Sequence, residues 1–347
     1  MAIKDRIIGA GFAALGATGL HRLAARTTRG RGAILMFHHV RPWRPSLPGF
    51  APNRLLEITP EFLERTIVLV RRLGFEIVAM DEVVGRLDGA SDKPFAALTF
   101  DDGYRDTLDY ALPILERHGA PFTCYIATGF ADRSARMWWL ELEEALRRAD
   151  AIEWDGKRVG TVTPRQKSRA FAALYNALRA GPEDRLLATI GELAARWGVD
   201  GAALVETLCM DWGGIAALSR RPLATLGAHS ISHRMLAKWP AEVARAEMLD
   251  SQRRIEARIG APVRHFAYPV GDPTSAGPRE FAFAREIGFA TAVTTRPGMI
   301  FSDHREHLAA LPRLSINGNW QNERNVEVLL SGAPFALWNR GSRVNVD

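Results

Sequence analysis

The sequence predicts an α/β protein in which parallel strands close into a barrel and a helical insertion interrupts the chain at 131–222. Short apolar runs alternate with helix-period segments over most of its 347 residues. Several of these runs end in polar residues, and parallel barrels carry their functional side chains at the carboxyl ends of the strands. Between 131 and 222 the alternation gives way to consecutive helical patterns.

The elements of the barrel follow from apolar spacing and from the residues that end helices. Helical segments have apolar residues at i, i+3 and i+4 spacing, and strands are short apolar runs. Gly74, Gly119 and Gly260 each follow a helical segment, as expected at a helix end. The expected elements are strand 33–37, helix 60–73, strand 75–78, helix 80–87, strand 95–100, helix 107–118, strand 122–127, strand 225–228, helix 240–259, strand 263–267, helix 279–287, strand 289–293 and strand 311–316.

The insertion is expected to form helices at 137–146, 163–178, 182–197 and 202–208. It is too long for an ordinary connection. Because it separates the two polar patterns described below, we expect it to pack beside the functional end of the barrel.

The composition is that of an ordinary globular protein, with 47% hydrophobic and 24% charged residues. The net charge of +6 comes mostly from arginines spread along the chain, without a dense basic run interleaved with aromatic residues. We therefore expect no nucleic-acid partner. Cys124 and Cys209 are the two cysteines, which form no disulfide framework and suit a reducing compartment.

The N-terminal residues 1–30 combine an apolar and a basic segment. The uncharged stretch 7–20 is too short to span a bilayer, and a basic segment follows it at 21–31. We expect a helix of a cytoplasmic protein that lies on the inner membrane face, with its arginines toward anionic headgroups. One alternative is a solvent-exposed helix, and another is a signal sequence in 1–25 of a secreted or periplasmic protein.

The apolar run at 96–100 ends in Asp101, Asp102 and Gly103. Two adjacent carboxylates repel each other unless a cation or a catalytic task holds them there. Since strand alternation points neighbouring side chains in different directions, one carboxylate can bind a metal while the other faces a substrate. Taken alone, the tripeptide also fits a solvated turn.

His229 and His233 follow a second strand-like run and lie four residues apart, on one face of an expected helical turn. Imidazole nitrogen and carboxylate oxygen suit zinc, and a catalytic site needs about three protein ligands plus an open position. The two histidines and one of the aspartates therefore form a candidate metal site. A pair of surface histidines is the alternative for this pattern alone.

These patterns, TFDDG at 99–103 and HSISH at 229–233, resemble the first and second motifs of the polysaccharide deacetylases. This family is carbohydrate esterase family four, which includes the nodulation chitooligosaccharide deacetylases. A third pattern, FAYPVG at 266–271, is similar to the family's aromatic-Pro-x-Gly motif. The resemblance covers about residues 33–320 and implies an incomplete, distorted barrel.

By this resemblance, Asp101 is the general base. The resemblance also implies that Asp102, His229 and His233 bind a divalent metal, with zinc expected and other divalent ions as alternatives. The chemistry agrees, because a metal that polarises an amide carbonyl and activates water works together with a carboxylate that takes the proton. The family's oxyanion-binding amide maps to Val270. The expected oxyanion and substrate-lining residues are Tyr268, Pro269, Val270 and Gly271.

The general acid is expected at His38. The sequence MFHHV at 36–40 resembles the Tyr-His-x-Val strand of poly-N-acetylglucosamine deacetylases, whose first histidine serves as the acid. If His38 points into the site, strand alternation points His39 away. Many family members instead use a C-terminal Leu-x-His motif, for which His304 and His307 are the alternatives, in a polar segment expected to be a solvated loop. A hydrogen-bonded core histidine is the other interpretation of His38.

One position departs from the family pattern. Many members have an arginine in the third motif that orients the base, and the aligned residue is Ala267. We expect Arg313, in the last strand, to supply the guanidinium, since its two-pronged geometry suits a carboxylate.

The sequence therefore predicts a metal-dependent hydrolase that removes N-acetyl groups from an N-acetylglucosamine-type glycan, either a chitooligosaccharide or an exopolysaccharide. A hydrolase of other non-peptide C–N bonds and, because of Ala267, a non-catalytic glycan-binding relative are the alternatives. Trp138 and Trp139 could stack on sugar rings or lie in a core. The expected organisation is an N-terminal helix in 1–30, a deacetylase domain in 31–330 interrupted by the insertion, and a tail in 331–347.

Overall fold

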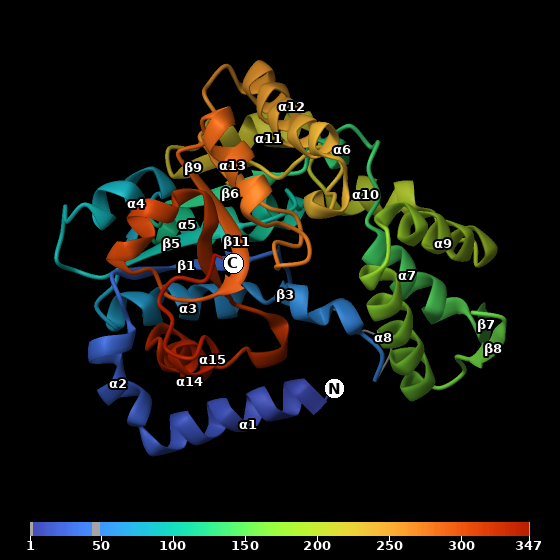
Figure 1. Cartoon of the computed structure of the whole chain (residues 1–347), viewed down its shortest axis with the longest axis horizontal. Helices are drawn as coiled ribbons and strands as arrows, with labels where there is room; N and C mark the ends of the chain where they lie inside the picture. The colour runs from blue at the N-terminus through green and yellow to red at the C-terminus, as the bar shows by residue number, and fades with distance from the viewer. Residues whose placement is uncertain (1–2, 44–48, 347) are drawn as a thin grey trace.

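The computed structural model describes residues 3–43 and 49–346, and its centre is a parallel barrel (Figure 1). Within that part of the chain, strands pair in the order β1-β12-β11-β10-β9-β6-β5, and β5 closes the ring by pairing with β1. The ring strands are β1 Gly32–Phe37, β5 Phe95–Phe100, β6 Phe122–Ile126, β9 Ala224–Ala228, β10 His265–Ala267, β11 Thr291–Pro297 and β12 Leu311–Ser315. The predicted barrel is confirmed, and it is incomplete because seven strands close it rather than the usual eight.

Strand β5 shows where the barrel departs from regular geometry. On one side it pairs with β1 along its whole length. On the other side, β4 (Glu76–Val78) pairs with the first half of β5 and β6 pairs with the second half. β4 is thus a further strand that joins the sheet outside the closed ring.

Helices cover the outside of the barrel. α3 begins after Thr59, whose side chain accepts a hydrogen bond from the Phe62 amide, and α12 ends at Gly260 with φ 69°. These helices are α3 Pro60–Arg72, α4 Met80–Leu87, α5 Leu112–Arg117, α12 Ala241–Ile259 and α13 Pro278–Ile287. All of them fall in predicted helical segments, although a π-helical turn at Thr107–Ala111 precedes α5.

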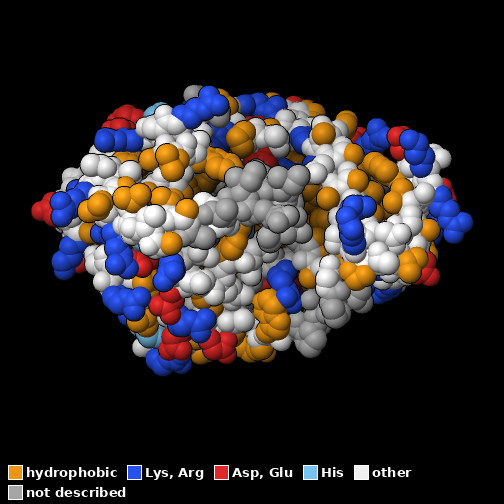
Figure 2. All heavy atoms as spheres, turned by 90° about the horizontal axis from the view of Figure 1, so that it is seen from below, with side chains coloured by type: hydrophobic (Ala, Val, Ile, Leu, Met, Phe, Trp, Pro, Cys, Tyr) orange, Lys and Arg blue, Asp and Glu red, His pale blue; other side chains and the backbone are white. Residues whose placement is uncertain are grey.

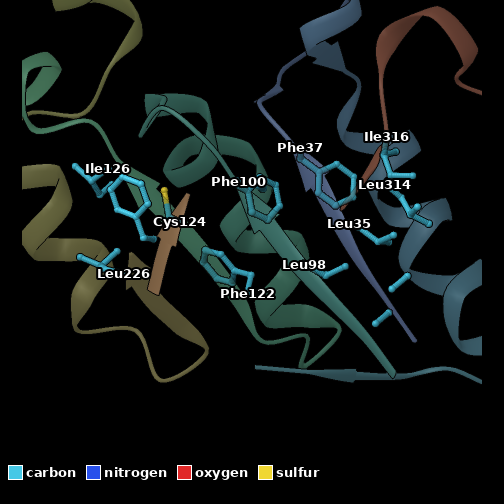
Figure 3. Packing of buried hydrophobic residues seen from close by; sticks show 14 of the residues in the cluster. Leu35, Phe37, Leu98, Phe100, Phe122, Cys124, Ile126, Leu226, Leu314 and Ile316 are labelled. Atoms are coloured by element: carbon cyan, nitrogen blue, oxygen red, sulfur yellow. The ribbon is translucent and has the colours of Figure 1, made fainter. Parts of the chain in front are cut away.

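Strand alternation divides the side chains between two layers. Leu35, Phe37, Leu98 and Phe100 belong to the core between the strands and the helices, where the Phe37 and Phe100 rings stack at 5.1 Å (Figure 3). The alternate residues, such as Ala97, belong to a separate cluster inside the ring. Polar residues that continue this inward series at a strand's end therefore reach the mouth of the barrel.

The chain between β6 and β9 forms the predicted insertion, which lies beside the barrel and has a core of its own (Figure 1). Its elements are α6 Thr128–Ala131, α7 Trp138–Arg148, β7 Ala151–Trp154, β8 Lys157–Gly160, α8 Pro164–Ala180, α9 Glu183–Arg196, α10 Gly201–Leu208 and α11 Trp212–Ser219. The four predicted helices are confirmed. The β7–β8 hairpin was not predicted, because its strands are short, only partly buried and have little apolar patterning.

The two ends of the chain pack together at one side of the barrel (Figure 1). The N-terminal segment forms two helices, α1 Ile3–Thr18 and α2 Leu20–Thr28, and the C-terminal segment forms α14 Glu323–Leu330 and α15 Ala333–Trp338. The expected tail at 331–347 therefore contains a helix, which forms because Ala333 and Phe335 find a buried position. In the ranges that the structure describes, no helix is long and apolar enough to cross a membrane.

Candidate active site

Asp102, His229 and His233 meet at the carboxyl ends of β5 and β9. Their ligand atoms all lie within 4.8 Å of one another, and the three side chains are buried. Oδ1 of Asp102 lies 3.4 Å from Nε2 of His229 and 3.2 Å from Nε2 of His233. The structure thus brings together the three predicted metal ligands from two distant parts of the sequence.

The environment of these atoms fits a bound cation. Oδ1 of Asp102 is buried and has no hydrogen-bond partner among the described residues. Nδ1 of His229 donates to the carbonyl of Ala267 at 2.7 Å, which leaves Nε2 free to act as a ligand. Burial raises the pKa of Asp102, but the neighbouring His233 and His229 outweigh this and hold the pKa well below its ordinary value. One carboxylate and two imidazoles match the ligand set of a zinc site with an open position.

The second motif is an irregular loop and not the expected helical turn. Ser230 and His233 have φ values of 61° and 56°, which no regular helix contains. Glu247 of α12 holds the loop by accepting hydrogen bonds from the amides of Ile231 (2.9 Å) and Ser232 (2.8 Å) and from the Ser232 hydroxyl (2.9 Å). Sequence reasoning missed Glu247, since a glutamate on a charged helix carries no local mark of this role.

Left-handed backbone conformations occur in all three motifs. Besides the two residues in the second motif, Asp102 has a φ of 71° and Val270 a φ of 62°. Such conformations are strained for residues other than glycine and concentrate at functional sites. Here they turn the Asp102 side chain and the Val270 backbone away from the directions that a continuing strand would impose.

Asp101 forms a bidentate ion pair with Arg313 of β12. Nη1 lies 2.7 Å from Oδ1, and Nη2 lies 2.6 Å from Oδ2. Arg313 is itself held by the carbonyl of Thr294 and the hydroxyl of Thr99. Burial raises the pKa of Asp101, but the charge and hydrogen bonds of Arg313 outweigh it, so the pKa is lowered overall. Arg313 therefore gives Asp101 a guanidinium partner from another strand. Ala267, at the position where many family members have an arginine, cannot provide one.

His38 follows β1 and continues the inward-facing series of that strand. It lies close enough to Asp101 and Asp102 for both carboxylates to favour its protonated form, whereas burial has the larger effect and lowers its pKa. His38 is partly exposed, as a group that must reach a substrate has to be. The structure thus places His38 with the metal ligands and Asp101.

His39 points away from these groups, as alternation predicts. It belongs to the short strand β2 (His39–Val40), which pairs with β3 (Glu57–Ile58) outside the ring. Its Nδ1 donates to Oδ2 of Asp106 at 2.5 Å, and the Val40 amide donates to Oδ1 of the same carboxylate at 3.1 Å. Asp106 therefore anchors the two residues that follow His38. Sequence reasoning missed it, although it is a third carboxylate only three residues after Gly103 of the Asp-Asp-Gly pattern.

The third motif consists of a core residue, Tyr268, followed by a tight turn. Tyr268 is fully buried and packs against Phe281 of α13, with its hydroxyl donating to the carbonyl of Ala309 at 2.9 Å. It is therefore a core residue, and its expected substrate-lining role is wrong because alternation turns it outward from the barrel. Pro269, Val270 and Gly271 form the tight turn that follows, closed by a hydrogen bond from the Gly271 amide to the Pro269 carbonyl at 2.7 Å.

Trp138 and Trp139 lie in the core of the insertion, only 4% and 6% exposed. The Trp139 ring lies 4.8 Å from the His233 ring, so it packs against a metal ligand. Of the two alternatives for these tryptophans, their burial supports a place in the core over stacking on sugar rings.

The C-terminal histidines lie at the opposite end of the barrel. His304 and His307 belong to a 3-10 helix, η4 Ser302–Ala310, which leads into the amino end of β12. The expected solvated loop is therefore wrong. His304 is fully buried, its Nδ1 accepts a hydrogen bond from the Phe301 amide at 3.1 Å, and burial lowers its pKa to about 4.

Comparisons with known proteins agree with this geometry. A family model described as polysaccharide deacetylase matches residues 88–289, more than half of the chain. No curated protein sequence matches. Similar solved structures include the Streptococcus pyogenes deacetylase PplD in complex with acetate (17% identity, TM-score 0.57, 85% of this chain and 96% of that one). IcaB from Ammonifex degensii is also similar (16% identity, TM-score 0.54, 86% and 98%). At these identities the structural likeness shows the fold.

Proposed function

Since the chain belongs to the polysaccharide deacetylase family, we propose that it is a divalent-metal-dependent hydrolase that removes N-acetyl groups from an N-acetylglucosamine-type oligo- or polysaccharide. The observation that carries the proposal is at the barrel mouth. There, a buried Asp-His-His set lies beside a second aspartate held by an arginine. The ligand set makes zinc the expected ion.

Asp101 is suited to take a proton from the attacking water. The bound ion would polarise the acetamide carbonyl and lower the pKa of water. Because Arg313 lowers the pKa of Asp101, this residue is a carboxylate at neutral pH and able to accept the proton. Arg313 also holds both carboxylate oxygens, so it fixes the orientation of the base. The Val270 amide is the proposed donor to the oxyanion that develops on the carbonyl oxygen.

His38 is the proposed proton donor to the departing amine. It ends a barrel strand next to the strand that carries Asp101, as the pairing of β1 with β5 requires. Burial lowers the pKa of His38, so its protonated form gives up the proton more readily than an ordinary imidazolium and is populated mainly below neutral pH.

The Arg313–Asp101 pair favours catalysis over a glycan-binding role without turnover. The role without turnover was considered because Ala267 stands where many family members have the arginine that orients the base. Arg313 of β12 makes an equivalent contact with Asp101. Geometry of this kind positions a base, whereas a binding module has no need of a fixed proton acceptor.

The test is acetate release from a panel of N-acetylated glycans, from chitooligosaccharides to poly-N-acetylglucosamine, with the metal removed by a chelator and then restored. We expect release that disappears on chelation and returns with zinc. Asp101→Asn is the matched control, because it should retain the metal and lose turnover. Release from small amides but from no glycan would instead favour the hydrolase of other C–N bonds. Metal binding with no release from any substrate would favour the non-catalytic relative.

A further inference from the structure

The helices at the two ends of the chain expose large apolar side chains on one part of the surface. Leu20 and Leu23 of α2 are 56% and 68% exposed, and Leu337 and Trp338 of α15 are 73% and 54% exposed. These are four of the nine large hydrophobic residues that are exposed in the described part of the chain. Since such residues are usually scattered singly, their concentration on two short helices points to a binding surface.

α2 and α15 pack against each other, which brings their exposed residues into one region of the surface. The Thr28 hydroxyl, at the end of α2, donates to the carbonyl of Ser331 at 2.7 Å. Gly332 then brings α15 so close that a Cβ at this position would lie 2.0 Å from the Thr28 carbonyl oxygen. We call six of the exposed residues of α2, α15 and the turn after it the terminal-helix face; they are Leu20, Leu23, Arg26, Leu337, Trp338 and Arg340.

Positive charge accompanies the apolar residues. Between Arg6 and Leu56 the sequence contains no aspartate or glutamate. A cavity of about 230 Å³ beside the end of α2 is lined by Arg26, Arg29 and Arg31, with Asp92 as its acidic residue. On the side of the molecule where α1 and α2 lie, hydrophobic side chains are interspersed with basic ones and with some acidic ones (Figure 2). Apolar residues next to arginines are the combination that binds an interface between hydrocarbon and anionic headgroups.

We propose that the terminal-helix face binds the surface of an anionic lipid bilayer and holds the enzyme there as a peripheral protein. The leucines and the tryptophan enter the headgroup region, and Arg26 and Arg340 contact lipid phosphates. The charge favours this occupant over a second copy of the chain, because two such basic faces would repel each other.

The arrangement leaves the catalytic site accessible. α2 leads directly into the amino end of β1, while His38 follows its carboxyl end. The six residues of β1 span about 20 Å, so the face and the site lie at opposite ends of the barrel. An enzyme bound in this way would present its barrel mouth away from the lipid, toward a glycan in solution.

Cosedimentation with vesicles tests the proposal on the full chain. We expect binding to vesicles of phosphatidylcholine with 30% phosphatidylglycerol, little binding to phosphatidylcholine alone, and weaker binding as salt is raised. Arg26→Glu with Arg340→Glu should reduce binding by at least about tenfold, because each reversal changes the charge near the headgroups by two units. Leu23→Ser with Leu337→Ser should reduce it comparably.

Matched controls come from exposed residues of the insertion. Arg158→Glu and Val162→Ser make the same kinds of change, a charge reversal and an apolar-to-serine replacement, away from the face and should bind like the wild type. All variants should retain wild-type circular dichroism and acetate release from a soluble oligosaccharide, which separates this proposal from the proposed function.

Two results would overturn the proposal. One is equal binding of the wild type and the face variants to anionic vesicles, or no binding by any of them. The other is a wild-type dimer in sedimentation that Leu23→Ser with Leu337→Ser dissociates, without vesicle binding, which would make the face a subunit interface.

Discussion

Replacement of Arg313 by methionine tests the catalytic geometry most directly. Arg313 and Asp101 are 1% and 2% exposed, and two hydrogen bonds of 2.7 and 2.6 Å join them. Methionine replaces the aliphatic stem of the arginine but has no guanidinium and no charge, so Arg313→Met leaves a carboxylate buried without its counterion. Removing one partner of a buried ion pair typically costs about 3–5 kcal/mol of folding free energy.

The same change alters the protonation of Asp101, and the sign can be worked out. In the wild type the pKa of Asp101 is lowered, so the carboxylate contributes stability above its ordinary pKa that is lost as pH falls through the lowered value. In Arg313→Met the effect of burial loses its main compensation, with only His229 and His38 still opposing it, so the pKa of Asp101 rises. A cost of about 3 kcal/mol corresponds to a rise of about 2 pH units, because each unit is worth 1.36 kcal/mol.

Two measurements check this reasoning. The acidic limb of kcat/KM for acetate release should move to higher pH by about 1–2 units, because Asp101 must lose its proton before it can act as the base. In urea denaturation, Arg313→Met should be destabilised, and adding Asp101→Asn should recover part of the loss, since the double variant buries no unpaired charge. Arg313→Lys keeps the charge without the bidentate contact. In both measurements it should therefore give values between those of the wild type and Arg313→Met.

The reasoning is refuted if Arg313→Met keeps both the acidic limb and the stability of the wild type. A loss of bound metal in this variant would also count against it, because Arg313 contacts none of the three ligands in the described structure. Metal content measured on the same preparations separates the two effects.

Four further predictions follow from the site and from the far end of the barrel. His229→Ala and His233→Ala should each abolish tight metal binding, measured by metal analysis after dialysis, whereas unchanged stoichiometry in both would remove the site assignment. His38→Ala should retain the metal and lower kcat by about a hundredfold or more, as loss of a general acid does, and a wild-type kcat would reassign the acid. Asp106→Asn should lower kcat at unchanged metal content, because it weakens the anchor of the residues that follow His38; a change in KM alone would contradict this. The pKa of His304 falls from 6.5 to about 4, so the neutral form stabilises the fold above pH 6.5, and about 3 kcal/mol of this is lost as pH falls toward 4. His304→Gln should flatten that part of the stability profile in urea titrations, and an unchanged slope would show that folding does not lower the pKa of His304.

The sequence by itself determined the features that depend on local patterning. An apolar run that ends in two carboxylates predicts a buried strand with functional residues at its end, and β5 with Asp101 and Asp102 has this form. The period of two within a strand separated His38 from His39 in the same way, because alternation is a property of neighbouring residues. Four of the insertion's helices were also predictable from apolar spacing.

Only the tertiary structure decided which groups face one another across the barrel. Arg313 could be named as a candidate, but its contact with Asp101 depends on where β12 and β5 stand around the ring, and no local pattern encodes that. The same holds for Glu247, which reaches the second motif from another helix. Tyr268 was misassigned because its motif indicated the site, whereas the register of β10 turns it into the outer core. Side-chain direction within a strand is local, but the partner that a side chain meets is set by the closure of the sheet and the packing of distant segments.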